Sequence, residues 1–90
     1  MSLKLFRTKT FLKEYKKLTM NDQHYAKYVE YITLLLKEQK LPKEALDHAL
    51  KGEFSQYREF HISGDLLIIY LIEEGYVKLV RIGTHAQLFE

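Results

Sequence analysis

Three histidines and one aspartate, spread along the second half of the chain, are the residues best suited to chemistry. They are His48, His61 and His85, with Asp65 shortly after the second histidine. A neutral imidazole accepts a proton near pH 7 and an imidazolium donates one, because the unperturbed pKa of histidine is about 6.5. If the fold brings these side chains together, they can perform general acid and base catalysis.

Cleavage of an RNA phosphodiester is a reaction that such a cluster fits. The 2′-hydroxyl needs a base, the leaving 5′-oxygen needs an acid, and the charge that builds on the phosphate needs cationic donors. Histidines, a carboxylate and an arginine such as Arg81 cover these roles without a metal ion. An aromatic side chain such as Phe89 could stack on a base and hold the scissile step in place.

Each candidate also has a purely structural interpretation. His48, directly after Asp47, fits a loop residue that bonds the backbone, and Phe89 fits a C-terminal anchor packed on the sheet. Arg58 and Glu59 fit exposed charges or a cross-strand pair. A zinc site made of the three histidines is disfavoured, because their spacing lacks the close pairs of familiar zinc motifs. We therefore predict neither a metal site nor a cofactor.

The elements that must position these residues start with a strand predicted over residues 54–62, which carries the middle histidine. Period-two alternation places Glu59 and His61 on the same face of this strand. A glycine-containing turn leads to the next strand, 65–73, which is apolar at almost every position. Both faces of that strand should be covered, so it is predicted to be central in the sheet.

The last strand is predicted over residues 76–83, where alternation groups Arg81 with Val77 and Leu79 on one face. Adjacent antiparallel strands bring the end of one and the start of the next to the same edge of the sheet. The middle histidine and the aspartate should therefore lie together there. The last histidine and Arg81 join them if the pairing of the last strand matches, and the loop that carries the first histidine is free to cover the group.

The first half of the chain is predicted to hold one strand and two helices. LKLFR at 3–7 alternates apolar and basic residues, as a half-buried or edge strand does. Thr8 or Thr10 can cap a first amphipathic helix. Asn21 can cap a second one, in which apolar residues repeat at helical spacing through about Glu38. The two helices should form a hairpin.

This order of strand, helix, helix, strand, strand, strand predicts an α+β fold, with two N-terminal helices packed on a small antiparallel sheet. Residues 40–52 follow no periodic pattern and are predicted to be a loop that can hold one helical turn around Glu44 to Leu46. The chain has 90 residues, which fit one small core, so a single domain over residues 1–90 is predicted.

The composition is that of a soluble globular protein, with 47% hydrophobic and 29% charged residues. The longest apolar run, residues 66–72, is far shorter than the roughly 20 residues that span a bilayer, and the N-terminus has no signal-peptide core. The absence of cysteine is compatible with a reducing compartment. We therefore expect a cytoplasmic protein with no membrane partner.

The formal net charge of +2 hides an uneven distribution of charge along the chain. Six basic residues and one acid, Glu14, lie among the first seventeen residues. Such a basic face can attract phosphate backbones, can suit an acidic protein partner, or can simply show its lysines to water. The basic residues are Lys4, Arg7, Lys9, Lys13, Lys16 and Lys17.

The series DHALKGEFSQYREFHISGDLLIIY, followed by LVRIGTHAQLF, resembles the YafQ-type toxins of the RelE/ParE superfamily. The N-terminal TKTFLKEYKKL fits their first helix, so the resemblance covers essentially the whole chain. It implies a bacterial type II toxin that is held inactive by a cognate antitoxin and cleaves mRNA in the ribosomal A site. It also implies a compact α+β fold with two N-terminal helices on an antiparallel sheet.

By position, the resemblance also implies roles for individual residues. His85 would act as the general acid, Asp65 would serve the base side together with one of the other two histidines, and Arg81 would steady the phosphate charge. One departure is Leu66, since relatives often have tryptophan there, and any stacking role at that position falls away. The implied catalytic residues are His48, His61, Asp65 and His85, and the implied substrate-binding residues are Glu59, Arg81 and Phe89.

Two rival functions use the same fold or the same charge. A toxin of the ParE branch would bind DNA gyrase without catalysis, and it would have no need for the histidines and the aspartate. A non-catalytic RNA-binding domain would need aromatic platforms or glycine loops, which the sequence lacks. The histidine and aspartate set therefore favours the ribonuclease.

Overall fold

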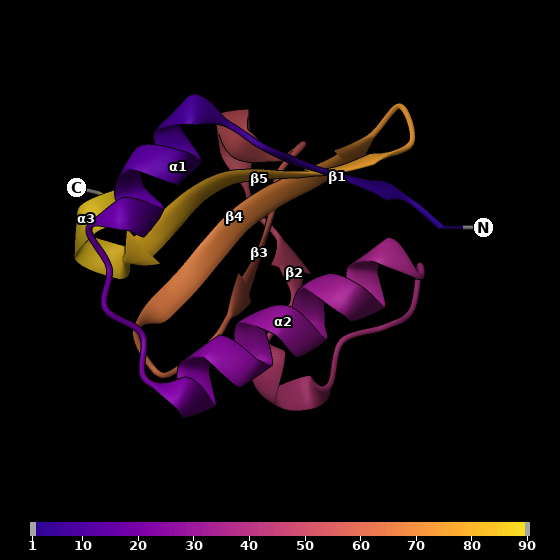
Figure 1. Ribbon diagram of the computed structural model, residues 1–90. Coiled ribbons are helices and arrows are strands. Elements are labelled where there is room, and N and C mark those ends of the chain that lie inside the picture. Colours follow the sequence, from indigo (N-terminus) through magenta and orange to yellow (C-terminus); the bar gives the residue numbers. More distant parts are fainter. Residues whose placement is uncertain (1, 90) are drawn as a thin grey trace.

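The computed structural model describes residues 2–89 and has an α+β architecture, which confirms the predicted fold class (Figure 1). Two helices follow the first strand, and the remaining strands form the second half of the chain. The elements are β1 (Lys4–Arg7), α1 (Lys9–Lys16), α2 (Asp22–Leu36), the 3-10 turn η1 (Lys43–Ala45), β2 (His48–Ala49), the 3-10 turn η2 (Gly52–Phe54), β3 (Arg58–His61), β4 (Leu66–Glu73), β5 (Tyr76–Thr84) and α3 (His85–Phe89).

The five strands form one sheet in the order β1-β5-β4-β3-β2. β4 is central, as its apolar sequence predicts. β1 runs parallel to β5, whereas the other neighbours are antiparallel, so the sheet is mixed rather than antiparallel throughout. Parallel neighbours need a long crossover connection, and here both helices and three strands separate β1 from β5 along the chain.

The two long helices begin at side-chain caps. Thr8 Oγ1 accepts a hydrogen bond from the backbone N–H of Phe11 at 3.0 Å, and Asn21 Oδ1 accepts one from that of His24 at 2.8 Å. Each cap satisfies a backbone donor that has no partner inside the helix. α2 ends at Leu36, slightly earlier than the sequence pattern predicts.

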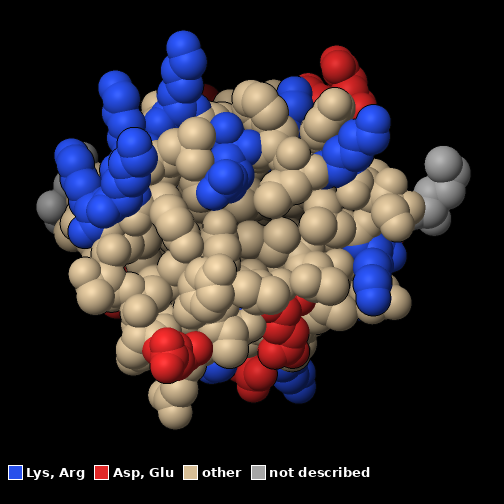
Figure 2. All heavy atoms as spheres, viewed as in Figure 1, with Lys and Arg blue, Asp and Glu red and all other residues tan. Residues whose placement is uncertain are grey.

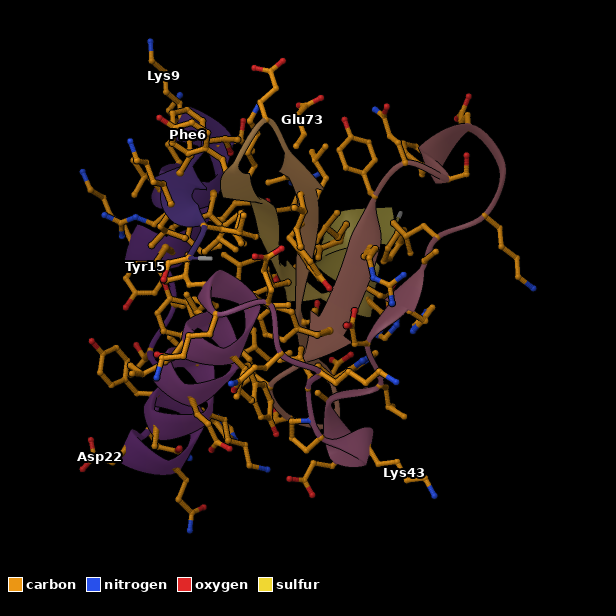
Figure 3. All side chains as sticks on the ribbon, turned by 90° about the vertical axis from the view of Figure 1, so that its right-hand side faces the viewer. Phe6, Lys9, Tyr15, Asp22, Lys43 and Glu73 are labelled. Atoms are coloured by element: carbon orange, nitrogen blue, oxygen red, sulfur yellow. The ribbon has the colours of Figure 1, made fainter. Side chains whose placement is uncertain are left out.

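The core lies between the sheet and α2, which crosses one face of it (Figure 1). Tyr31 of α2 packs edge-on against Phe60 of β3 with ring centroids 5.9 Å apart, and Phe60 packs against Tyr70 of β4 at 5.6 Å. Each buried aromatic contributes about 1.5–3 kcal/mol by leaving water. In Figure 3, Lys9, Tyr15 and Asp22 mark the two helices, and Lys43 marks η1, which adds Ala45 to the same core.

A β-bulge in β5 changes which residues share a face. Ile69 of β4 pairs with Arg81, but Tyr70 pairs with Leu79, so Val80 has no opposite partner. The alternation therefore reverses at Val80. Arg81 lies on the face opposite Leu79, and the predicted grouping of Arg81 with Leu79 and Val77 is wrong.

The region predicted as a loop is more ordered than its sequence suggests. It contains η1, which confirms the predicted helical turn, and the short strand β2, in which His48 pairs with Glu59 and Ala49 with Arg58 of β3, while η2 begins at the last residue of the region. β3 starts only at Arg58, later than predicted, because the chain turns at η2 first. Helix α3 was also not predicted. None of the helices within residues 2–89 is both long and apolar enough to cross a membrane.

Candidate active site

A buried carboxylate, that of Glu59, lies at the centre of the histidine cluster. Its side chain is only 5% exposed, and its Oε2 atom lies 3.7 Å from His48 Nε2, 3.7 Å from His61 Nε2 and 4.0 Å from His85 Nε2. Three imidazoles from distant parts of the sequence thus converge on one oxygen atom. The predicted gathering of the histidines is present, with Glu59 as its centre.

The sheet register brings these side chains together. His48 of β2 lies directly opposite Glu59 of β3, and His61 follows two positions later on the same face of β3. His85 is the first residue of α3, directly after β5 ends. β3, β4 and β5 are adjacent and antiparallel, so the end of β3 and the end of β5 lie at the same edge of the sheet.

Asp65 lies beside His85, at the exposed rim of the cluster. Its Oδ1 atom is 3.6 Å from His85 Nδ1 and accepts a long hydrogen bond of 3.4 Å from the His85 backbone N–H. The Asp65 side chain is 71% exposed. The structure therefore places Asp65 next to the expected acid, whereas Glu59 lies next to both histidines of the expected base side.

His61 is the deepest of the three histidines, at 9% exposure. Its ring lies against that of His85, with centroids 5.4 Å apart. Its Nδ1 atom is buried and has no hydrogen-bond partner among the described residues. A buried polar atom without a partner is costly, and such atoms concentrate where function requires them.

His48 makes one contact that fits a structural loop residue and one that fits a catalytic residue. Its Nδ1 atom lies 2.6 Å from the carbonyl oxygen of Leu46, so the ring bonds the backbone as a loop residue would. That contact requires a proton on Nδ1. In the neutral ring Nε2 then carries the lone pair, and Nε2 is the atom that faces Glu59.

Arg81 lies on the same face as Glu59, and it is held by Glu14 of α1. The Arg81 guanidinium donates from Nε at 2.9 Å and from Nη2 at 2.7 Å to Glu14 Oε2. Hydrogen bonding to Glu14 raises the pKa of Arg81. Glu14 Oε1 also accepts from the backbone N–H of Ile82 at 3.1 Å. Sequence reasoning missed this role of Glu14, although Glu14 is the only acid in the basic N-terminal segment.

A hollow of about 410 Å³ adjoins Arg81 on this face of the sheet. Phe54 of η2 and Phe89 of α3 line it and are each about half exposed. The Phe89 ring also lies near that of His85, with centroids 5.9 Å apart. Phe89 is therefore not a buried anchor. The remaining lining residues are Leu50, Tyr57, Ile69, Val80 and Leu88.

The residues that could hold a metal ion are Glu59, His61 and His85. One ligand atom from each lies within 4.8 Å of the others, and imidazole with carboxylate is a donor set that suits zinc and copper. The spacing of His48, His61 and His85 gave no sign of this site, because one of its three possible ligands is Glu59. A metal ion is therefore compatible with the cluster.

Positive charge gathers over α1, on the face of the molecule shown in Figure 2. Lysine side chains of this helix extend into solvent, and Lys13 and Lys16 lie in its last turn. Cations at a helix C-terminus are favourable because they complement the helix dipole. The uneven charge seen in the sequence is thus a feature of one surface.

A mixed sheet with α2 on one face, and imidazoles and carboxylates gathered on the other, is a RelE-like α+β fold with a candidate acid-base site. A family model described as the bacterial toxin of type II toxin-antitoxin systems, YafQ, matches residues 3–90. The chain therefore belongs to the YafQ toxin family, which confirms the resemblance seen in its sequence.

Named relatives and solved structures agree with this assignment. The mRNA interferase toxin YafQ of Escherichia coli (strain K12) is 36% identical over 63 residues, which cover 68% of each chain. The toxin chain of the E. coli DinJ-YafQ toxin-antitoxin complex has a TM-score of 0.85 and 27% identity, with both chains covered completely. A metal-bound toxin from Helicobacter pylori has a TM-score of 0.86 and 36% identity, and the match covers 97% of this chain and 99% of that one.

Proposed function

We propose that this chain, as one toxin domain over residues 1–90, is an endoribonuclease that cleaves mRNA in the ribosomal A site. The observation that carries the proposal is the convergence of three imidazoles on the buried Glu59 carboxylate. A cluster of proton donors and acceptors of this kind suits acid and base catalysis. The name of the E. coli relative, an mRNA interferase, supports the same activity.

His85 acts as the general acid in this proposal. Its imidazolium protonates the leaving 5′-oxygen as the P–O5′ bond breaks, and Asp65 beside Nδ1 gives the protonated ring a charge partner. His85 is about half exposed, so a substrate can reach it.

The base is His48 or His61, with Glu59 rather than Asp65 as its carboxylate partner. The base takes the proton of the 2′-hydroxyl, and the 2′-oxygen then attacks the neighbouring phosphorus. His48 offers its Nε2 lone pair because Nδ1 is bonded to the Leu46 carbonyl. The products are a 2′,3′-cyclic phosphate and a 5′-hydroxyl.

Arg81 and the adjoining hollow bind the substrate in this proposal. Glu14 fixes the guanidinium in one orientation through Nε and Nη2, and Nη1 remains to contact a phosphate oxygen. Phe89, near His85, is placed to stack on a base next to the cut, and Phe54 offers a second aromatic surface in the same hollow.

These proton transfers need no metal ion. An ion held by Glu59, His61 and His85 would supply Lewis-acid chemistry. It would also occupy lone pairs that the proton transfers use.

The proposed partner is a cognate antitoxin with an acidic segment, helical or disordered, that docks near the basic surface of α1. The complex of the E. coli relative with DinJ supports such a partner, and the lysines of α1 supply charge complementarity. A substrate on the ribosome implies action in the cytoplasm. The sequence and the site give no reason to expect a membrane partner.

The experiment that tests the function maps the ends of transcripts after brief expression, with and without intact ribosomes. The expected result is new 5′-hydroxyl ends inside coding regions that depend on ribosomes. The same cells would be assayed for plasmid supercoiling. Intact transcripts with lost supercoiling would support a gyrase binder instead and contradict the nuclease.

A further inference from the structure

A second polar cluster lies on the face of the sheet opposite the histidines, and the proton transfers proposed above do not use it. It joins Asp47, which precedes β2, to Arg58 of β3 and Tyr70 of β4. The Tyr70 hydroxyl donates to Asp47 Oδ1 at 2.7 Å. Arg58 Nε donates to the same oxygen at 3.2 Å and to the Tyr70 hydroxyl oxygen at 3.3 Å. We call these three residues the Asp47 clamp.

The clamp is anchored in the paired strands of the sheet. Arg58 pairs directly with Tyr70 across β3 and β4, and it pairs with Ala49 across β2 and β3. Tyr70 is 1% exposed and its ring packs against Phe60. Burial, followed by the bond to Asp47, raises the pKa of Tyr70, so its hydroxyl stays a donor across the physiological pH range.

The other end of the clamp reaches the active site through one peptide bond. Asp47 and His48 are neighbours, and strand alternation sends their side chains to opposite faces of the sheet. The clamp therefore holds the backbone from which the His48 imidazole extends towards Glu59. β2 has only two residues, so apart from the clamp few hydrogen bonds between strands hold this backbone.

The backbone next to the clamp is in an unfavourable conformation. Leu46 has a φ of +51°, which lies in the left-handed region that favours glycine. Its carbonyl oxygen is the acceptor for His48 Nδ1. Leu46 is also exposed, so packing does little to hold it there. The Leu46 backbone N–H donates to the Lys43 carbonyl at 3.0 Å on one side, and the bonds to the adjacent Asp47 hold the chain on the other.

We propose that Asp47 and Tyr70 are positioning residues for His48. They hold the turn at Leu46 so that the imidazole keeps its proton on Nδ1, bonded to the Leu46 carbonyl, and presents Nε2 towards Glu59. This inference rests on the proposed role of His48 in proton transfer. Without the clamp the turn relaxes, the Nδ1 bond is lost, and the neutral ring is free to place its proton on Nε2.

The first test removes the clamp and measures single-turnover RNA cleavage on a fixed substrate. Tyr70→Phe keeps the ring but removes the donor, and Asp47→Ala removes the acceptor. Both should lower the rate of the chemical step by about 10- to 100-fold, with KM nearly unchanged. Asp47→Asn, which keeps an acceptor for Tyr70, should restore part of the loss. The matched control is Tyr28→Phe, which removes a hydroxyl from a buried tyrosine of α2 and should leave the rate unchanged.

A double-mutant cycle separates positioning from a general loss of structure. If Asp47 acts through His48, adding Asp47→Ala to His48→Ala should cause no further loss of rate. A residue that merely stabilises the fold would lower the rate of His48→Ala by the same factor as that of the wild type. That second outcome would overturn the inference.

A spectroscopic test does not depend on activity at all. Long-range proton–nitrogen NMR spectra report which nitrogen of each neutral histidine carries the proton. His48 should show the Nδ1–H form in the wild type and in Tyr28→Phe, and a mixture of both forms in Tyr70→Phe. Unchanged His48 signals in Tyr70→Phe would overturn the inference. Wild-type activity of His48→Ala would instead refute the role of His48, while the spectra would still test the clamp.

Discussion

The Glu59 carboxylate is the residue on which the site depends most, because each histidine of the cluster approaches it within 4.0 Å. Replacing Glu59 with Gln keeps the shape of the side chain but removes its charge. We predict that Glu59→Gln lowers the single-turnover rate by about 100-fold or more, since the imidazoles lose their shared charge partner. The matched control is Glu30→Gln on the exposed side of α2, which should react like the wild type. Equal rates for both variants would refute a central role for Glu59.

The metal-compatible trio of Glu59, His61 and His85 gives a second prediction for individual residues. Removal of transition metals with 1,10-phenanthroline, at constant magnesium so that ribosomes stay intact, should leave the cleavage rate unchanged. Added copper or zinc should slow cleavage, because a bound ion competes with protons for the imidazole lone pairs. A rate that falls with the chelator and recovers with added metal would contradict metal-independent catalysis.

The residue types in the sequence were enough to predict that the histidines and Asp65 form one site, and that this site needs an arginine. They could not show that Glu59 is central or that Glu14 holds Arg81. Both facts depend on which side chains meet across different elements, and periodicity reports only which side chains share a face of one element.

Among the elements, η2 and α3 matter most for the proposed substrate binding, because they supply the two phenylalanines that line the hollow. These are Phe54 and Phe89. We predict that Phe54→Ala and Phe89→Ala each raise KM, since stacking on a base is worth about 1–3 kcal/mol. The matched control is Phe6→Ala on β1, a phenylalanine of similar exposure that lies outside the hollow. Steady-state kinetics on a short mRNA bound to ribosomes measures the effect. A KM that rises equally for Phe6→Ala would rule out a specific stacking role.

The elements with regular patterns were predicted well. The caps at Thr8 and Asn21 and the apolar run of β4 follow from local physics, and all three are present. The bulge at Val80, the parallel pairing of β1 and the two-residue strand β2 were missed. Strand pairing depends on tertiary contacts, and nothing in a single strand marks where one residue will be skipped.

At the scale of the whole molecule, positive charge marks the surface of α1, where we propose that the antitoxin docks. The lysines of α1 extend over the face shown in Figure 2, while the histidine cluster lies on the other side of the sheet from α2. We predict that Lys13→Glu with Lys16→Glu weakens binding of the cognate antitoxin and reduces the salt dependence of its Kd, because two attractive charges become repulsive. The control is Lys43→Glu on η1, which lies on the far side of the molecule from α1 (Figure 3). Equal weakening by the control would show that net charge, not this surface, matters.

General acid catalysis by His85 can be tested most directly with an RNA in which sulfur replaces the 5′-oxygen at the cut. A thiolate leaves without a proton, so the acid becomes unnecessary while the base is still needed. His85→Ala should cleave ordinary RNA far more slowly than the wild type but should cleave the sulfur-containing RNA at nearly the wild-type rate. Glu59→Gln should remain slow on both substrates. If His85→Ala is as defective with sulfur as with oxygen, the proposed proton transfer from His85 does not occur.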